Sequence, residues 1–465
     1  MIVRLLPVVL LVLSVCQVQA AAAQEERGIS ANGYSVDLMA LYREARLEDP
    51  RIISAYAKAR SASEQQRAAL GGLLPQVSAN GGYNRILRKD DASREIYDNN
   101  NYGLSLTQYI YNKQAWESWQ KSKSVSRQKV SEADEAQAEA TVDLAKRYFI
   151  ALAADDDLEL IMAERRATQK NLDQVNALYV RQMAKITDQL DLQARVDSLA
   201  AQEVESRNQV RLSRAALAEL VGRPINERLS RVRSDVEFQA PMESLDNWLQ
   251  LAASGNPALK ASQSGVEAAE AAVREGKGGH YPSLTFSLSG QQSDVGYDNT
   301  LTPRSDSYVA TLGVKVPIYS GGSTSARVRG LYDDQQVAEE QLEGVRRQVV
   351  KETTNAYLTA QSSVEKIRAS RNALSSASQS SIAAQKAFTY GVVNAVDVLN
   401  SVQNEFKARR DLLKAQYDFV INLFALNRWA GKLSEGSVAS VNAWLSADDT
   451  NVIQPDASNP KQVSR

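Results

Sequence analysis

The sequence is poor in the residues that build reactive sites. It contains one His and one Cys in 465 residues. A zinc site made of Cys and His therefore cannot form within the chain, and neither can an internal disulfide. A Ser-His-Asp triad or a Cys-His dyad would depend on His280, the single His. His280 follows Gly278 and Gly279, and the sequence shows no set of catalytic partners for it. We therefore predict a protein that is not an enzyme and that binds no metal or cofactor.

An excess of charge of one sign is also missing, as are chain breakers. The chain has 54 Lys and Arg against 55 Asp and Glu. Nucleic-acid-binding domains usually show a strong basic excess, so we expect no nucleic-acid partner. Only 23 Gly and 11 Pro occur, well below the roughly 12% of an average chain. So few turn-forming residues predict few, long elements.

Residues 1–23 have the pattern of a secretory signal peptide. Arg4 precedes an apolar stretch from Leu5 to Val15, and small residues up to Ala23 fit a cleavage site. This stretch is too short for a membrane anchor, although Cys16 leaves a lipoprotein signal open. No later apolar run approaches the ~18 residues of a transmembrane helix. The mature chain is therefore expected either to stay soluble outside the cytoplasm or to enter a membrane as β-strands.

The chain contains two copies of one unit. Six landmarks recur at nearly constant spacing, among them Pro50 and Pro257, which lie 207 residues apart. Each copy reads as a helix, two strands, a very long helix and a returning helix. The predicted divisions are a first repeat at 36–225, a connector at 226–242, a second repeat at 243–433 and a disordered tail at 440–465.

Each copy contains one helical stretch of unusual length. The first runs from Lys113 to Arg181 without Gly or Pro, and the second runs from Ser323 to Tyr390. At 1.5 Å per residue such a helix is roughly 100 Å long. Two shorter helices in each copy, predicted at 50–73 and 188–221 in the first, have about the same summed length. The sequence therefore predicts antiparallel, coiled-coil-like rods.

Four segments alternate apolar and polar residues, as strands with one apolar face do. Between Tyr308 and Val316, for example, Leu312 lies on the apolar face and Lys315 on the polar face. Each segment has about 10 residues, enough for a tilted strand across a bilayer. Aromatic residues at or near the segment ends fit a girdle at a membrane boundary: Tyr83, Tyr102, Tyr109, Tyr111, Trp116, Tyr308 and Tyr319. The alternative is a small soluble sheet packed on the helices.

Four strands per chain cannot close a membrane barrel, since the smallest known barrel has eight. An open sheet edge is not tolerated in lipid either. Several chains would therefore have to share one barrel. Three chains would give 12 strands, and the same three-fold axis would gather the helices into a hollow tube.

The junctions between strands and helices resemble those of the TolC family of outer-membrane efflux and secretion ducts. The resemblance covers nearly the whole mature chain. It is carried by Leu74-Pro75, by Leu106-Thr107-Gln108-Tyr109-Ile110-Tyr111, by Val316-Pro317-Ile318-Tyr319-Ser320-Gly321-Gly322, and by Tyr390-Gly391 followed by Ala395-Val396-Asp397-Val398-Leu399. It implies a mostly helical homotrimer with a 12-stranded β-barrel in outer-membrane lipid and a long periplasmic α-helical barrel. It also implies a periplasmic adaptor and an inner-membrane pump, ABC-type or proton-driven, as partners.

The resemblance places a closed entrance at the breaks between the long and the returning helices. Acidic residues form rings at this constriction in the family. By position these rings correspond here to Asp188, Asp191, Asp397 and Asn400, where Asn400 replaces a second Asp of the later copy. The turns themselves contain Tyr179, Lys185, Phe388, Gly391 and Val393. Phe388 and Val393 replace a Tyr and an Arg, so the polar latch of the family is in doubt here.

Several of these residues also have plainer interpretations. Asp188 and Asp397 fit N-caps or first-turn acids, which the helix dipole favours. The run 155–157, three Asp on a long helix, points to different faces and is predicted to be a solvated surface rather than a metal site. The run 407–410 is predicted to be a solvated or interhelical charge set.

The function that this sequence predicts is a passive outer-membrane export duct. A soluble periplasmic coiled-coil adaptor is the alternative, but it would lack the alternating strands. The sequence leaves open whether the cargo is protein, as in type I secretion, or small toxic compounds.

Overall fold

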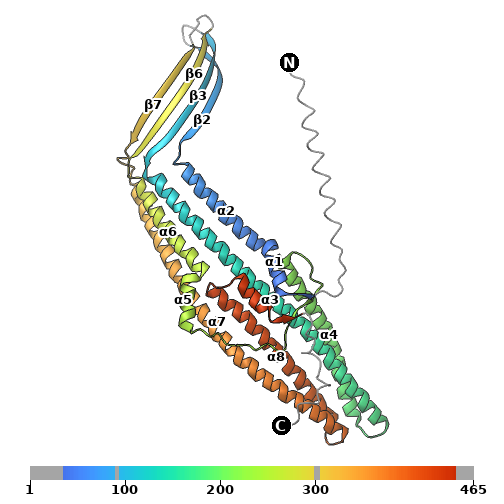
Figure 1. Cartoon of the computed structure of the whole chain (residues 1–465). Helices are drawn as coiled ribbons and strands as arrows, with labels where there is room; N and C mark the ends of the chain where they lie inside the picture. Colours follow the sequence, from blue (N-terminus) through green and yellow to red (C-terminus); the bar gives the residue numbers. More distant parts are fainter. Residues whose placement is uncertain (1–34, 90–93, 298–303, 447–465) are drawn as a thin grey trace, which may run out of the picture.

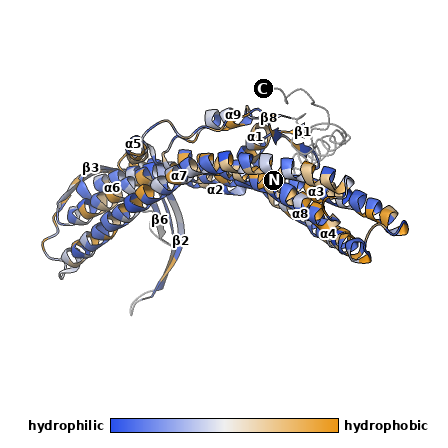
Figure 2. Cartoon of the chain, turned by 90° about the horizontal axis from the view of Figure 1, so that it is seen from below, coloured by the Kyte–Doolittle hydropathy of each residue, from blue (hydrophilic) through white to orange (hydrophobic). Residues whose placement is uncertain are grey.

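A computed structural model describes residues 35–89, 94–297 and 304–446. The predicted signal peptide at 1–23, with Cys16, lies outside the described residues. Over the described ranges the chain forms an elongated rod with a sheet at one end and long helices along the rest (Figure 1). Seen along its length the rod is curved, and α5 and α9 lie on its convex side (Figure 2).

The same order of elements occurs twice. The first half contains β1 (Ser35–Val36), α1 (Leu38–Glu48), α2 (Pro50–Gly71), β2 (Gln76–Lys89), β3 (Arg94–Asn112), α3 (Lys113–Val180) and α4 (Ile186–Val221). The second contains α5 (Leu245–Gly255), α6 (Pro257–Gly278), β6 (Ser283–Tyr297), β7 (Ser305–Lys315), α7 (Ser323–Thr389), α8 (Ala395–Trp429) and α9 (Glu435–Asn442). The short strands β4 (Arg228–Leu229) and β5 (Arg231–Val232) lie between the halves, and β8 (Leu445–Ser446) follows α9.

Local signals explain where the helices begin and end. Asp49 caps α2 by accepting a hydrogen bond from the Arg51 backbone N–H at 2.8 Å, and Pro50 occupies the first helical turn. Asn256 and Pro257 repeat this arrangement at α6. Gly222, with φ of 77°, ends α4 in the left-handed conformation. The predicted 68-residue helix is confirmed as α3, at about 100 Å.

The four long strands form one antiparallel sheet in the order β2-β3-β6-β7. Helices follow the same order, because α3 packs on α2 and α6, and α6 packs on α7. In the other half of the rod, α3 packs on α4 and α8, and α8 packs on α7. The chain is thus one curved layer whose two free sides are β2 with α2 and β7 with α7.

The strands are longer than predicted. The sequence suggested about 10 residues each, whereas β2 has 14 and β3 has 19. The additional residues, such as Asn99, Asn100 and Asn101, do not alternate apolar and polar side chains. Backbone pairing nevertheless continues through them, because the ladder needs only N–H and C=O groups. The pattern therefore revealed only the strand halves nearer the helices.

The main apolar core lies midway along the rod. Tyr148 and Phe149 of α3 and Phe419 and Phe424 of α8 are fully buried there. The first residues of the predicted tail join this core, which corrects that prediction for 440–446. Val441 of α9 is buried, and β8 pairs with β5 of the connector. Residues 447–465 lie outside the described residues.

Among the described residues, none of the helices combines the length and the apolar character required to cross a membrane.

Candidate duct gate

The two breaks between long and returning helices lie at the end of the rod opposite the sheet (Figure 1). The α3–α4 turn closes through hydrogen bonds from the Gln182 N–H to the Tyr179 carbonyl at 2.8 Å and from the Met183 N–H to the Leu178 carbonyl at 2.9 Å. The α7–α8 turn uses Gly391 with φ of 74°, whereas Gln182 adopts φ of 61° without being Gly. Both turns therefore reverse the chain within a few residues.

Asp188 and Asp397 occupy the same place in the two repeats, the third residue of a returning helix. Asp397 belongs to a capping box: its backbone N–H donates to the Asn394 side chain at 2.8 Å, and its carboxylate accepts from the Asn394 N–H at 3.4 Å. Lys185 is the N-cap of α4 but makes no side-chain capping bond. The first-turn position is thus what the structure shows for both acids, and the helix dipole favours negative charge there.

Asp191 and Asn400 lie one turn further along the same helices. Asp191, Asp397 and Asn400 are exposed, and Asp188 is half-buried. Within the described ranges these side chains make no ion pair. The carboxylates of Asp188, Asp191 and Asp397 are therefore not held by a cation in the described part of the chain. Carboxylates that form a ring in an assembly must be unbound in this way.

An apolar cluster joins the two turns. It consists of Leu172, Val175, Leu192, Val196, Ala395 and Leu399, with Phe388 and Ala184 packed against it. Phe388 thus contributes an apolar contact at the second turn. Tyr179 lies partly exposed, outside the cluster. The sequence pattern did not reveal this cluster, because its members come from four helices.

A buried carboxylate links three helices above the turns. Glu164 of α3 is 1% exposed and pairs with Arg195 of α4 and, at 2.8 Å, with Arg410 of α8. Arg410 also binds Asp157 at 2.9 Å. The two hairpins α3–α4 and α7–α8 are therefore held together by both an apolar and an ionic contact. The prediction of an interhelical charge set in 407–410 holds for Arg410.

The three consecutive Asp of α3 are not a solvated surface, which corrects that prediction. Asp155 pairs with Arg214 of α4 at 2.7 Å, and Asp156 pairs with Arg231 of β5 at 2.8 Å. They do point to different faces, as helix geometry requires. Each face, however, is covered by a different neighbour, which the sequence spacing could not show.

Asp156 is the most buried of these acids. It is 2% exposed, and the Tyr417 hydroxyl donates a hydrogen bond to it. Burial raises the pKa of Asp156 to about 6, although Arg231 and the Tyr417 hydrogen bond oppose the shift. Burial and the neighbouring carboxylate also raise the pKa of Tyr417. The middle of the rod therefore contains an acid that titrates near the lower end of the physiological range.

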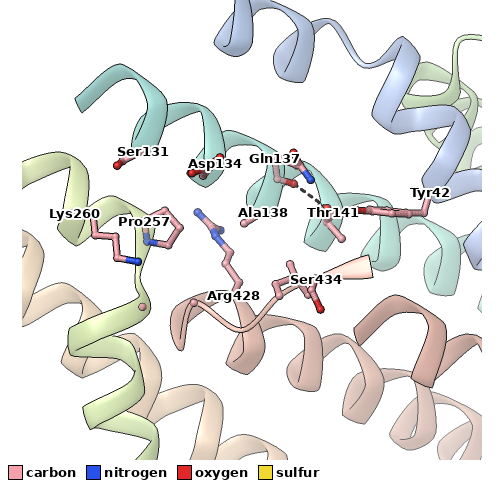
Figure 3. Close-up of a pocket in the computed structure, with 13 residues that line it drawn as sticks. Tyr42, Ser131, Asp134, Gln137, Ala138, Thr141, Pro257, Lys260, Arg428 and Ser434 are labelled. Atoms are coloured by element: carbon pink, nitrogen blue, oxygen red, sulfur yellow. Dashed lines mark hydrogen bonds between the residues drawn. The ribbon is translucent and has the colours of Figure 1, made fainter. Parts of the chain in front are cut away.

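A polar cavity of about 300 Å³ lies between the repeats, far from the turns. Figure 3 shows Arg428 reaching into it from α8 and Lys260 from α6, with Asp134 and Gln137 on α3. Arg428 is already bound to Glu135 at 2.6 Å. No group of three or more His, Cys, Asp or Glu that could hold a metal ion occurs among the described residues. The expectation of no cofactor stays a prediction.

The predicted girdle residues occupy two levels of the sheet. Tyr109 and Tyr111 lie at the end of β3, Trp116 lies in the first turn of α3, and Tyr319 follows the end of β7. Tyr83 and Tyr102 lie within β2 and β3, and Tyr308 near the start of β7. Tyr102 alternates with Leu104 on the apolar face, and Tyr111 returns to that face opposite Leu284 after a register shift, whereas Tyr109 lies opposite Thr285 on the polar face. Three of the seven aromatics thus lie within strands rather than at the strand ends near the helices, and the girdle stays a prediction.

Comparisons with known proteins agree with this architecture. A family model described as outer membrane efflux protein matches residues 41–223 and 248–432. The chain is 29% identical over 420 residues to the outer membrane protein TolC of Vibrio cholerae, covering 90% of this chain and 95% of the relative. It is 27% identical over 432 residues to the alkaline protease secretion protein AprF of Pseudomonas aeruginosa, covering 90% and 89%.

Solved structures show the same fold. The Campylobacter jejuni CmeC outer membrane channel matches with a TM-score of 0.76 at 14% identity, covering 87% of this chain and 89% of that one. The open state of the Neisseria gonorrhoeae MtrE outer membrane channel matches with a TM-score of 0.73 at 18% identity, covering 86% and 90%. The predicted helical tunnel with a β part is thereby confirmed.

The family match covers most of both halves and confirms three predictions: the family, the outer-membrane location with an extension into the periplasm, and the role as an exit duct for efflux and type I secretion. The alternative of a soluble adaptor is not supported. The chain belongs to the family of outer membrane efflux proteins.

Proposed function

We propose that three copies of this chain form one continuous duct whose periplasmic entrance is controlled by acidic rings at the helix turns. The observation that carries the proposal is the place of Asp188 and Asp397. They are equivalent residues of the two repeats, at the one end of a rod whose other end is the sheet. A three-fold axis would bring six such carboxylates together. Rings of carboxylates select for cations.

The sheet supports an assembly of several copies. One face of the four strands carries exposed apolar side chains: Val77, Leu104, Leu288, Leu312 and Val314 are each 47–66% exposed. The strands β2 and β7 have no partner on their outer edges within the described sheet. Lipid tolerates the apolar face but not the open edges. Neighbouring copies would satisfy those edges, and three copies would supply 12 strands.

The proposed partners are a periplasmic adaptor and an inner-membrane pump, ABC-type or proton-driven. The gate end of the rod exposes apolar side chains, including Val180 and Tyr390 at 82% and 83%. Exposed apolar groups of this kind fit a docking surface. The cargo is proposed to include proteins and small compounds, because relatives named for protease secretion and for efflux are both similar to this chain. Deletion of the gene, followed by secretome analysis and drug-susceptibility testing, separates these cargo classes.

Planar-bilayer conductance tests the gate. Asp397→Asn removes the charge but keeps a side-chain oxygen for the capping box, so it should reduce cation preference and weaken block by multivalent cations. Asn394→Ala is the matched control, because it breaks the capping box and keeps the charge. If Asn394→Ala changes ion preference as strongly as Asp397→Asn, or if Asp397→Asn changes nothing, the acids act as helix caps and the ring is rejected.

A further inference from the structure

Strands of the two repeats can meet in two ways, within one chain and between two copies of the chain. Within the chain the second strand of the first repeat, β3, pairs with the first strand of the second repeat, β6. We call this contact the inner seam. The second strand of the second repeat, β7, and the first strand of the first, β2, have no strand partner on their outer edges among the described residues. We call a contact between β7 of one copy and β2 of the next the outer seam.

The two repeats pair their strands in the same register. Within the first repeat Val77 pairs with Leu106, and within the second Leu284 pairs with Val314. Adding 207 to the β2 number and 208 to the β3 number converts the first pair into the second. The same offsets convert every pair of the β2–β3 ladder that has a counterpart in the β6–β7 ladder. The repeats thus fix one numerical rule that relates equivalent strand positions.

Applied to the inner seam, this rule gives the register of the outer seam. Thr107 pairs with Ser287 in the inner seam. The equivalent residue of Thr107 on β7 is Lys315, and the equivalent of Ser287 on β2 is Asn80. We propose that copies of this chain join through an antiparallel β7–β2 seam in which Lys315 of one copy lies opposite Asn80 of the next. This proposal rests on the multi-copy duct proposed above and specifies how its copies meet.

The register keeps each side chain on its proper face. A one-residue slip would turn the whole apolar face of one copy toward the polar side. In the proposed seam Leu312 lies opposite Tyr83, both from the apolar face. Thr311 lies opposite Asn84, both from the polar face. The two faces therefore continue from one copy to the next without interruption.

Charges on the helices below the sheet agree with this seam. In the inner seam Arg127 of α3 pairs with Glu267 of α6 at 2.6 Å. The equivalent of Glu267 on α2 is Arg60, so the sign is reversed on that side. Arg60 and its neighbour Lys58 are exposed and have no ion-pair partner among the described residues.

The equivalent stretch of α7 carries the opposite charge. Asp333, Asp334 and Glu340 are exposed there, also without an ion-pair partner in the described part of the chain. They lie around Gln335, which stands at the place of Arg127. A cationic edge on α2 and an acidic edge on α7 are complementary between copies, and like charges would oppose any α2–α2 or α7–α7 contact. A second copy of this chain, in head-to-tail order, is thus the partner that both edges fit.

Disulfide cross-linking tests the register. The only cysteine of the sequence is Cys16 in the predicted signal peptide, so introduced cysteines are expected to have no competitor in the mature protein. Asn80→Cys is combined in turn with Gly313→Cys, Lys315→Cys and Pro317→Cys in the full protein, which is purified in detergent and oxidised. A disulfide needs Cβ atoms within about 4.5 Å, whereas neighbours two residues along a strand are about 7–8 Å away.

The matched control is Thr107→Cys with Ser287→Cys, the inner-seam pair at the equivalent position. It should form a disulfide within one chain, and it shows that this type of pair can be oxidised. We expect an interchain product on a denaturing non-reducing gel that is strongest for Asn80 with Lys315, at least several-fold over the two flanking pairs. A maximum at a flanking pair overturns the register.

Failure of the inference and failure of the multi-copy duct are distinguishable by size. A trimeric particle in which the control pair oxidises but none of the three outer pairs does overturns the proposed seam alone. A monomeric particle in detergent, with no interchain product, overturns the assembly itself. Arg60→Glu gives an independent readout, since it should lower the temperature at which the particle dissociates, whereas Arg211→Glu on α4 should not.

Discussion

At the residue scale, the buried carboxylate of Asp156 holds separate parts of the fold together. Its carboxylate lies between Arg231 of the connector and Tyr417 of α8, so it ties a linking strand to both repeats. Removing a charged group from water is costly unless its partners compensate. Here they compensate only in part, because the pKa of Asp156 remains raised to about 6.

This pKa predicts a pH dependence of stability. Since the folded protein holds the proton more tightly than the unfolded chain, Asp156 contributes stability that is complete below about pH 4 and is lost as pH rises to about 6. The loss is on the order of 2–3 kcal/mol. In Asp156→Asn this component should disappear, so thermal unfolding of wild type and variant, measured from pH 4 to pH 7.5, should differ by an amount that changes with pH. Asp155→Asn, whose carboxylate pairs with Arg214, serves as the control. Parallel curves for wild type and Asp156→Asn would contradict the prediction.

At the element scale, the gate depends on how the hairpin α3–α4 is held against the hairpin α7–α8. Glu164 is the central contact, since it binds a cation on each of two other helices. Removing one partner of a buried pair costs about 3–5 kcal/mol, because the remaining charges lose their compensation. The apolar cluster around Phe388 then remains the main contact between the turns.

Glu164→Gln should therefore loosen the two hairpins without unfolding the middle of the rod. We expect faster hydrogen exchange in α4 and in the first half of α8, and a larger closed-state conductance in bilayers. Glu405→Gln is the matched control, because Glu405 is also buried but, within the described part of the chain, its ion pair is to Arg409 of its own helix. Equal effects of the two variants on conductance would show that Glu164 has no special role between the hairpins.

Much of the arrangement of the helices could be predicted from the sequence. The helices α3 and α7 lack internal breaks, and Pro50, Pro257 and Gly222 mark element ends through local backbone chemistry. The contacts between hairpins could not be predicted, because Glu164 and Arg410 are 246 residues apart and nothing local distinguishes a buried acid from a solvated one. The same reason explains why the prediction of a solvated surface for the run 155–157 is wrong.

At the scale of the whole molecule, the internal repeat determines more than the fold. Each repeat has one strand edge without a partner in the described sheet, on β2 in the first repeat and on β7 in the second. The β3–β6 contact between the repeats shows how two such edges can pair. The number of copies does not follow from this rule, since two copies would already supply the eight strands of the smallest known barrel; the three copies of the proposed duct follow from the resemblance to the family. The full length of the strands was likewise hidden, since Asn99 to Asn101 pair through backbone alone.

A duct built in this way should have charge of opposite sign at the two ends of its helical part. The polar face of the sheet is uncharged between the rows of Gln76 and Asn84. Lys315, which is exposed, lies on the same face nearer the helices. If the apolar face meets lipid, this polar face lines the bore, and three copies place three ammonium groups at its junction with the helices. Cationic rings favour anions, whereas the carboxylates at the other end favour cations.

Lys315→Gln should therefore increase cation preference, seen as a shift of the reversal potential across a bilayer with a salt gradient. Lys315→Arg keeps the charge and should leave the potential unchanged. Because Lys315 and Asp397 lie at opposite ends of the helical part, about 100 Å apart, their effects should add, and Lys315→Gln with Asp397→Asn should return toward wild type. An unchanged reversal potential in Lys315→Gln would mean that the polar face does not line the conducting path, and the assignment of faces in the sheet would have to be reversed.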